Sequence, residues 1–159
     1  MSVVDEVTTA NEGFASEFQE GGLPMPPGRK FAVVTCMDAR LDPARFLGFE
    51  TGDAHVIRNA GGLVNDETIR SLVISHHLLG TQEVLVVGHT DCGMLTFTNA
   101  ELHERLGPES ESIDFQPFHD VAERVRQSVE AIRSNSLLPD SFQATGFVYD
   151  VWSGRIEPV

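Results

Sequence analysis

The two cysteines of the chain stand beside residues that could bind a metal ion. Cys36 lies in "VVTCMDAR", directly after an apolar run. Cys92 lies in "GHTDCGM", and His89 precedes it with the spacing H-x2-C. Two thiolates and one imidazole are a ligand set of an open zinc site, in which the fourth position is left for water or substrate. Cys36, His89 and Cys92 are therefore candidate ligands of Zn2+.

The same pattern is also compatible with inert thiols. Cys is among the most buried residue types, and a single H-x2-C spacing is a weak signal of metal binding. Asp38 and Arg40 follow Cys36 closely, and a charged pair directly after a buried strand is unusual for a plain core. An exposed ion pair would contribute under about 1 kcal/mol, so this pair could also be a surface feature. The residues alone leave both interpretations open.

The elements predicted around these residues alternate between strands and helices. Apolar runs predict buried strands at 31–36, 54–59 and 83–89, and a further strand, a Ser-Gly turn and a short edge strand close the chain. Caps and helical periodicity predict a short helix between Asp42 and Gly48 and helices at 65–80, near 93–106 and at about 117–134. The last helix has an apolar face made by Phe118, Val121, Val125, Val129 and Ile132.

This alternation predicts an α/β fold with a mainly parallel sheet flanked by helices. Ligands of such sheets collect at the carboxyl ends of the strands. Cys36 ends the first strand and His89 ends the third. If these two strands are neighbours, Cys36, His89 and Cys92 converge on one point.

The first 28 residues differ from the rest of the chain. A weak helical pattern runs through Phe14 and Phe18, and "GGLPMPPG" at 21–28 interrupts it. We expect residues 1–28 to form an N-terminal helical arm and linker, and residues 29–159 to form one α/β domain. The arm could reach across to another subunit, or it could be a frayed terminus.

Charge and hydropathy exclude several classes of partner. The chain has 11 Lys and Arg against 24 Asp and Glu, a formal net charge of −13, which disfavours binding to nucleic acid or to anionic membranes. No apolar run approaches the roughly 18 residues of a membrane span, and the start has no pattern of a secretory signal. We therefore expect a cytoplasmic protein whose two cysteines do not form a stable disulfide.

Three segments together resemble the β-class carbonic anhydrases. "CMDAR" and "GHTDCG" are similar to the two signatures of that family, C-x-D-x-R and H-x2-C, and "GDAHVIRNAGG" at 52–62 is similar to the segment between them. The likeness covers about residues 30–95 and is greatest to short microbial members, including relatives that hydrolyse carbonyl sulfide. It implies Zn2+ as cofactor and a homodimer or dimer of dimers.

The resemblance also implies roles for single residues. Cys36, His89 and Cys92 would hold the zinc, and Asp38 and Arg40 would be the family's dyad. In some members the Asp becomes a fourth ligand, and in others it pairs with the Arg. Zn2+ with two thiolates is already neutral, so Arg40 competes with the metal for the Asp38 carboxylate. We hypothesise a switch between these states that lowers activity at lower pH.

The implied chemistry is attack of hydroxide on a small linear heteroallene. Zinc lowers the pKa of bound water from 15.7 toward roughly 7. CO2 hydration to bicarbonate is the leading expectation, carbonyl sulfide hydrolysis to H2S and CO2 is the alternative, and a non-catalytic zinc-stapled module is less favoured. The backbone N–H of Gly93 could bind the anion, and Ala60 and Gly61 could line the pocket. His55 could be a proton shuttle, although a structural strand histidine is the better expectation.

Overall fold

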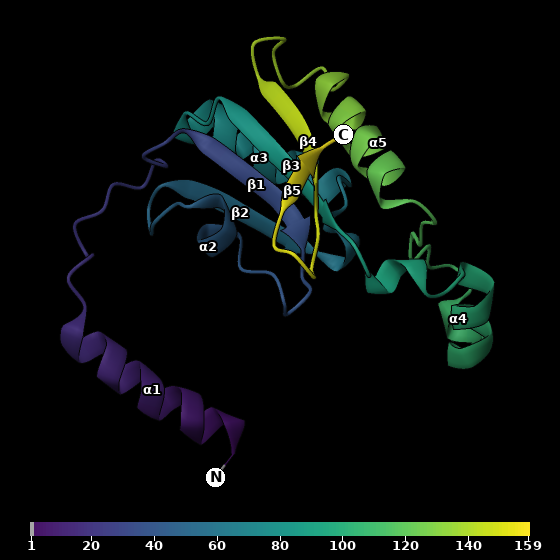
Figure 1. Ribbon diagram of the computed structural model, residues 1–159, viewed down its shortest axis with the longest axis horizontal. Coiled ribbons are helices and arrows are strands. Elements are labelled where there is room, and N and C mark those ends of the chain that lie inside the picture. Colours follow the sequence, from purple (N-terminus) through teal and green to yellow (C-terminus); the bar gives the residue numbers. More distant parts are fainter. Residues whose placement is uncertain (1) are drawn as a thin grey trace.

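The computed structural model describes residues 2–159 and contains a five-stranded sheet with the strand order β2-β1-β3-β4-β5 (Figure 1). The strands are β1 (Phe31–Cys36), β2 (Ala54–Asn59), β3 (Glu83–His89), β4 (Gln143–Tyr149) and β5 (Ile156–Pro158). The first four strands are parallel, and β5 pairs antiparallel with β4 at the edge. The predicted fold class is confirmed. The strands at 31–36 and 83–89 are neighbours, so the condition for Cys36, His89 and Cys92 to converge is met.

Helices cover both faces of the sheet. The α-helices are α1 (Val3–Glu17), α2 (Pro43–Leu47), α3 (Asp66–Leu79), α4 (Asn99–Leu106) and α5 (Val121–Arg133), and those that pack on the sheet are α2, α3 and α5. Leu72 of α3 and Val125 of α5 pack with Val34 and Val86 on one face. The other face of β1 and β3 packs against α2 and the loop that follows it. Burial of all six β1 residues explains why this strand reads as a continuous apolar run.

Two predicted helices have other bounds in the structure. The helix predicted at about 117–134 begins only at Val121, because the Asp120 side chain accepts a hydrogen bond from the Glu123 backbone N–H and caps the helix there. Phe118 therefore lies outside the helical face and packs with the cluster around Cys36.

The stretch predicted as helical near 93–106 is divided in two. A 3-10 turn covers Gly93–Leu95, and α4 starts after Thr98, which forms a capping box with Glu101. The acidic loop after α4 contains a short 3-10 turn at Pro108–Ser110.

The N-terminal helix α1 lies away from the sheet, and none of its residues is buried (Figure 1). The extended segment after α1 joins the body where the Gly28 N–H donates to the Gly52 carbonyl (2.8 Å). A division of the chain into an arm and a domain at residue 28 stays a prediction. Among residues 2–159, the helices are all too short or too polar to cross a membrane.

The turn after β2 approaches the end of β1 so closely that it requires glycine. Gly62 has a φ of +62°, and a Cβ atom there would lie 2.9 Å from the Thr35 carbonyl carbon and 3.0 Å from the Cys36 nitrogen. Both are backbone atoms, so neither can move aside without shifting β1. The close approach places the 3-10 turn Ala60–Gly62 directly against Cys36.

We expect Gly62→Ala to destabilise the protein by about 3 kcal/mol, because the left-handed conformation costs roughly 1–2 kcal/mol and the backbone clash adds to it. The matched control is Gly80→Ala, since Gly80 also has a positive φ (+77°) but has nothing within 4 Å of the added atom. Urea unfolding followed by circular dichroism measures both changes. Equal losses in the two variants would show that the close approach at Gly62 has no energetic weight.

Candidate metal centre

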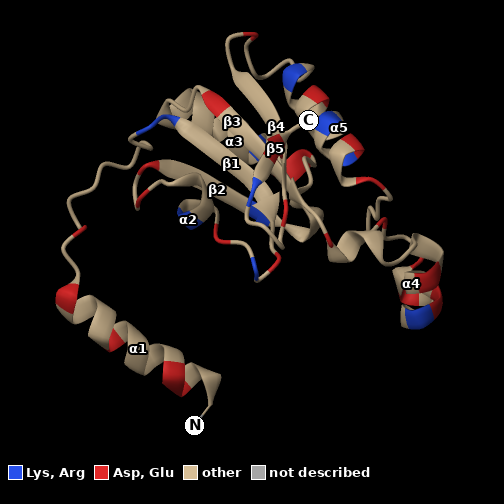
Figure 2. Cartoon of the chain, in the orientation of Figure 1, with Lys and Arg blue, Asp and Glu red and all other residues tan. Residues whose placement is uncertain are grey.

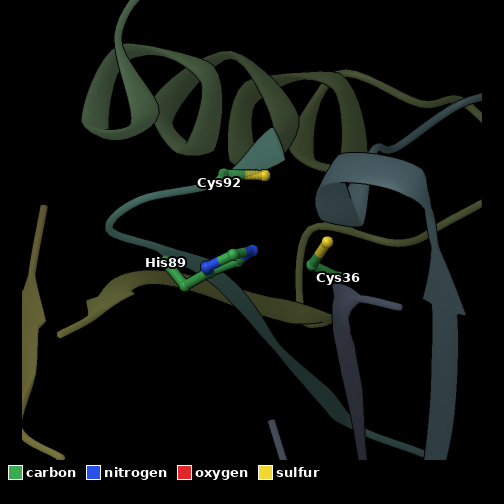
Figure 3. A group of neighbouring side chains, drawn as sticks. All are labelled: Cys36, His89 and Cys92. Atoms are coloured by element: carbon green, nitrogen blue, oxygen red, sulfur yellow. The ribbon is translucent and has the colours of Figure 1, made fainter. Parts of the chain in front are cut away.

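Cys36, His89 and Cys92 meet at the carboxyl edge of the sheet. Cys36 ends β1, His89 ends the neighbouring β3, and Cys92 follows in the turn after β3. Their ligand atoms all lie within 4.8 Å of one another, and all three residues are buried. Figure 3 shows the two sulfur atoms and the imidazole directed at a common space. We call these three residues the trio.

The backbone around Cys36 is held by several hydrogen bonds. Arg58 of β2 donates to the carbonyl oxygens of Cys36 (3.0 Å) and Asp38 (2.7 Å). The Gly61 N–H donates to the Cys36 sulfur (3.4 Å), so the turn after β2 supports the thiolate directly. The Asn59 side chain in turn closes that turn, accepting from the Leu63 N–H and donating to the Leu63 carbonyl.

His89 presents one ring nitrogen to the trio. Its Nδ1 lies 2.9 Å from the Thr90 carbonyl oxygen, which can only accept, so Nδ1 carries the proton and Nε2 offers a lone pair. Nε2 is buried and has no hydrogen-bond partner among residues 2–159. A buried nitrogen without a partner is costly, and a metal ion would satisfy it.

The two thiols shift each other's pKa in opposite directions. Donation from the Cys92 thiol lowers the pKa of Cys36 to about 4, and the same interaction together with burial raises the pKa of Cys92. Burial is the largest single influence on His89 and lowers its pKa, but the Cys36 sulfur, the Thr90 carbonyl and the Asp38 carboxylate together raise the pKa of His89 above its usual value. A dication would replace these protons and stabilise both thiolates. Tetrahedral zinc separates its N and S ligands by roughly 3.5–3.8 Å, so the trio fits it after a small contraction.

Asp38 and Arg40 form a close pair beside the trio. Arg40 donates to Asp38 through Nε (3.0 Å) and one Nη (2.8 Å). These bonds hold the pKa of Asp38 well below its usual range and raise the pKa of Arg40. Asp38 Oδ2 lies 3.9 Å from His89 Nε2. Of the two dyad states that the resemblance implies, the structure thus has the one in which the Asp pairs with the Arg.

A pocket of about 260 Å3 opens beside the trio. Its lining is mostly apolar and consists of Cys36, Met37, Asp38, Ala60, Gly61, Cys92, Gly93 and Met94. The residues predicted to contact substrate, Ala60, Gly61 and Gly93, all lie on its wall, while their roles toward a substrate stay predictions. Asp38 is the charged residue among those that line it.

The other histidines lie apart from the trio or are held by backbone atoms. His55 sits four residues before the end of β2 and hydrogen-bonds Ser75 of α3 (2.7 Å), in a different groove. At about 3.3 Å per residue this places it more than 10 Å along the strand from the site edge, too far for direct proton transfer. His76 and His77 bond the carbonyls of Thr81 and Leu137.

Comparison with known proteins agrees with this geometry. A family model described as carbonic anhydrase matches residues 31–116. The chain is 45% identical to β-carbonic anhydrase 1 of Mycobacterium tuberculosis, with 100% of this chain and 99% of the relative covered. The chain belongs to the β-carbonic anhydrase family. It is thus a member of an enzyme family whose members use zinc.

Two further relatives show the range of the family. The crystal structure of carbonic anhydrase from Streptococcus mutans superposes with a TM-score of 0.93 at 44% identity, covering 100% of this chain and 98% of that one. Carbon disulfide hydrolase of Acidianus sp. (strain A1-3) is 34% identical over 83% of this chain and 78% of its own length. Relatives of this chain are therefore named as enzymes with different substrates, carbonic anhydrase and carbon disulfide hydrolase.

Sequence reasoning missed three residues of the site. Asp91 stands in the turn between His89 and Cys92 without a predicted role at the site, but its carboxylate accepts a hydrogen bond from Arg40 at 2.7 Å. Phe118 and Met94 pack with Cys36 and Cys92. No sequence spacing relates Phe118 to the cysteines. For Asp91 a signal was present, because an acidic residue directly before the candidate ligand Cys92 could pair with Arg40.

We expect the purified protein to bind one zinc ion per chain and His89→Ala to lose most of it, because the trio would keep only two ligands. Zinc content by mass spectrometry after dialysis against a weak chelator measures this. The control is His119→Ala, since His119 is exposed and lies outside the trio. Retention of full zinc content in the His89 variant would contradict the assignment.

Proposed function

We propose that the chain catalyses the reversible hydration of CO2 to bicarbonate at a zinc ion held by Cys36, His89 and Cys92. The observation that carries the proposal is the buried trio that opens onto a small apolar pocket beside the Asp38–Arg40 pair. The full-length similarity to β-carbonic anhydrase 1 supports the same reaction.

When bound, zinc would supply Lewis acidity and a lowered pKa for water. The residues of the chain would do the rest. Asp38 is ionised at neutral pH, and Arg40 lowers its pKa further, so its carboxylate can only accept hydrogen bonds and would orient an O–H group in the pocket. The apolar wall around Ala60 and Met94 suits an uncharged linear substrate and disfavours retention of a charged product.

Hydrolysis of a sulfur-containing heteroallene such as carbonyl sulfide is the second candidate. Two observations favour it. The pocket wall is mostly apolar, with Asp38 as the charged residue among those that line it, which suits a less polar substrate. A relative named carbon disulfide hydrolase is 34% identical. A non-catalytic zinc staple is less favoured, because a closed structural site has no need for the Asp38–Arg40 pair.

We expect Asp38→Ala to lower kcat for CO2 hydration about 100-fold, because a positioned hydrogen-bond acceptor is lost, while zinc content stays at one per chain. Stopped-flow measurement with a pH indicator gives the rate. Asp140→Ala is the control, since Asp140 is an exposed residue of a turn. Zinc-loaded wild-type protein without turnover of CO2 at any pH would overturn the proposal.

The two substrates are separated by parallel assays of one zinc-loaded preparation. We expect rapid CO2 hydration in stopped flow and slow release of H2S from carbonyl sulfide in headspace analysis. Rapid H2S release with a negligible CO2 rate would reverse the order of the two candidates.

We also propose that the protein assembles as a homodimer or a dimer of dimers through its N-terminal arm. Val3, Val7, Phe14 and Phe18 are between 48% and 72% exposed, although side chains of this size are seldom left in water on one element. Figure 2 shows acidic residues along α1, and the first 28 residues contain no Lys or Arg. An apolar and acidic helix of this kind would pack on another surface that supplies apolar and basic groups.

We expect the double variant Phe14→Glu, Phe18→Glu to reduce the molar mass measured by light scattering after gel filtration, because its charges oppose burial of the arm. The control is Leu106→Glu, since Leu106 is 56% exposed on another helix, α4. An unchanged mass in the double variant would contradict a role for the arm in assembly.

A cytoplasmic location is proposed as well. Cys36 and Cys92 are both free thiols, and a reducing compartment keeps thiols in that state.

A further inference from the structure

Asp91 has an unusual backbone conformation in the turn between His89 and Cys92. Its φ is +53°, in the left-handed region that Asp and Asn tolerate better than most residues. This conformation turns two acceptors of one residue toward Arg40. The Asp91 carboxylate accepts from one Arg40 Nη at 2.7 Å, and the Asp91 carbonyl accepts from the other at 2.9 Å.

Arg40 thereby connects the two loops that carry the cysteines. Its Nε and one Nη bond Asp38, in the loop after Cys36, while both Nη groups bond Asp91, next to Cys92. An isolated exposed ion pair contributes little, but a planar guanidinium shared by two carboxylates has a fixed geometry. The exposed pairs on α3 and α5 differ, because each joins residues three apart on one helix.

The Asp38 carboxylate depends on Arg40 for its orientation. In the described part of the chain it accepts three hydrogen bonds, and all of them come from the backbone or side chain of Arg40. The Arg40 side chain is 46% exposed, so little packing restrains it. A long side chain of this kind has many rotamers when it is not anchored. The bonds to Asp91 are its anchor on the β3 side.

We propose that Asp91 is a positioning residue, which holds Arg40 against Asp38 and so keeps the Asp38 carboxylate turned away from the trio. The Asp38 carboxylate is already close to the trio, since its Oδ2 atom lies 3.9 Å from His89 Nε2. Without the Asp91 carboxylate, Arg40 keeps only the backbone carbonyl of residue 91 as its anchor on the β3 side. Its hold on Asp38 is then weaker, and the Asp38 carboxylate can swing to the position that a substrate or water would take. The inference rests on the proposed metal centre and deepens it.

The competing explanation is that Asp91 only shapes its turn, and two substitutions separate the explanations. Asp91→Gly removes the carboxylate while glycine adopts the positive φ freely. Asp91→Asn keeps the turn and one oxygen acceptor but loses the charge. A matched control is Glu123→Gln, which removes one charge and one ion pair, to Arg126, on the surface of α5.

The first readout is structural and needs no activity. Crystal structures of the zinc-loaded and metal-free variants give the Asp38–Arg40 and Asp38–His89 distances, and the Arg40 Nε–H signal in nitrogen-correlated NMR reports the hydrogen bond. We expect Asp91→Gly to lose the Asp38–Arg40 bonds and to bring Asp38 onto the trio in the zinc-loaded protein. Asp91→Asn should be intermediate, and Glu123→Gln should equal the wild type.

The second readout is a double-mutant cycle with Arg40→Ala. We expect Asp91→Gly to lower kcat about tenfold in the wild-type background and to have almost no effect in the Arg40→Ala background, because Asp91 acts through Arg40. A turn-shaping role predicts the same effect of Asp91→Gly in both backgrounds.

Each outcome decides between the explanations. Unchanged Asp38 and Arg40 positions in Asp91→Gly, or equal effects in both backgrounds, would overturn the positioning role. If the wild type proved inactive toward every heteroallene tested, the proposed function would fail, whereas the structural readout would still decide on Asp91.

Discussion

The parallel pairing of β1 with β3 is the constraint on which the rest of the site depends. It places the ends of two strands, separated by more than fifty residues of sequence, side by side, with Thr35 opposite Val87 and Cys36 and His89 just beyond. The buried Thr35 hydroxyl strengthens this pairing by donating to the Val87 carbonyl at 2.8 Å. The register therefore fixes the separation of a thiol and an imidazole before any metal is present, and the short turn to Cys92 adds the third donor.

The trio concentrates polar atoms where the surroundings are apolar. The two buried thiols shift each other's pKa, and among residues 2–159 the His89 Nε2 atom has no hydrogen-bond partner, within a cluster packed by Leu41, Met94 and Phe118. In a site of low dielectric such a group is costly unless a charge of opposite sign compensates it. The burial of these polar atoms therefore costs free energy in the metal-free protein, and the same burial favours binding of a dication.

Around the trio, the chain separates two electrostatic roles. The Gly61 backbone N–H donates to the Cys36 sulfur, while the Arg40 guanidinium binds the carboxylates of Asp38 and Asp91. Cationic side chains are scarce in this chain, which has 11 Lys and Arg against 24 Asp and Glu. Arg40 is placed where an unpaired carboxylate would compete for the metal position.

Much of the architecture followed from local patterns. Continuous apolar runs gave the bounds of β1 and β3, and the caps Asp42, Asn65 and Gly80 located the helices α2 and α3. The ends of the later helices did not follow, since the hydrogen bonds of Thr98 and Asp120 to their own helix starts outweighed the apolar periodicity that continues past them.

By itself, the sequence determined which residues could bind a metal and which strands would position them. The reason is that residue type fixes the donor atoms, and the pattern of apolar residues indicates the buried strands. Only the tertiary structure decided how these residues meet. The conformation of Asp91, the Asp38–Arg40 bonds and the packing of Phe118 against the cluster that contains the cysteines arise from the register of neighbouring strands and the path of loops. Those are interactions between distant segments, and no local pattern encodes their distances or orientations.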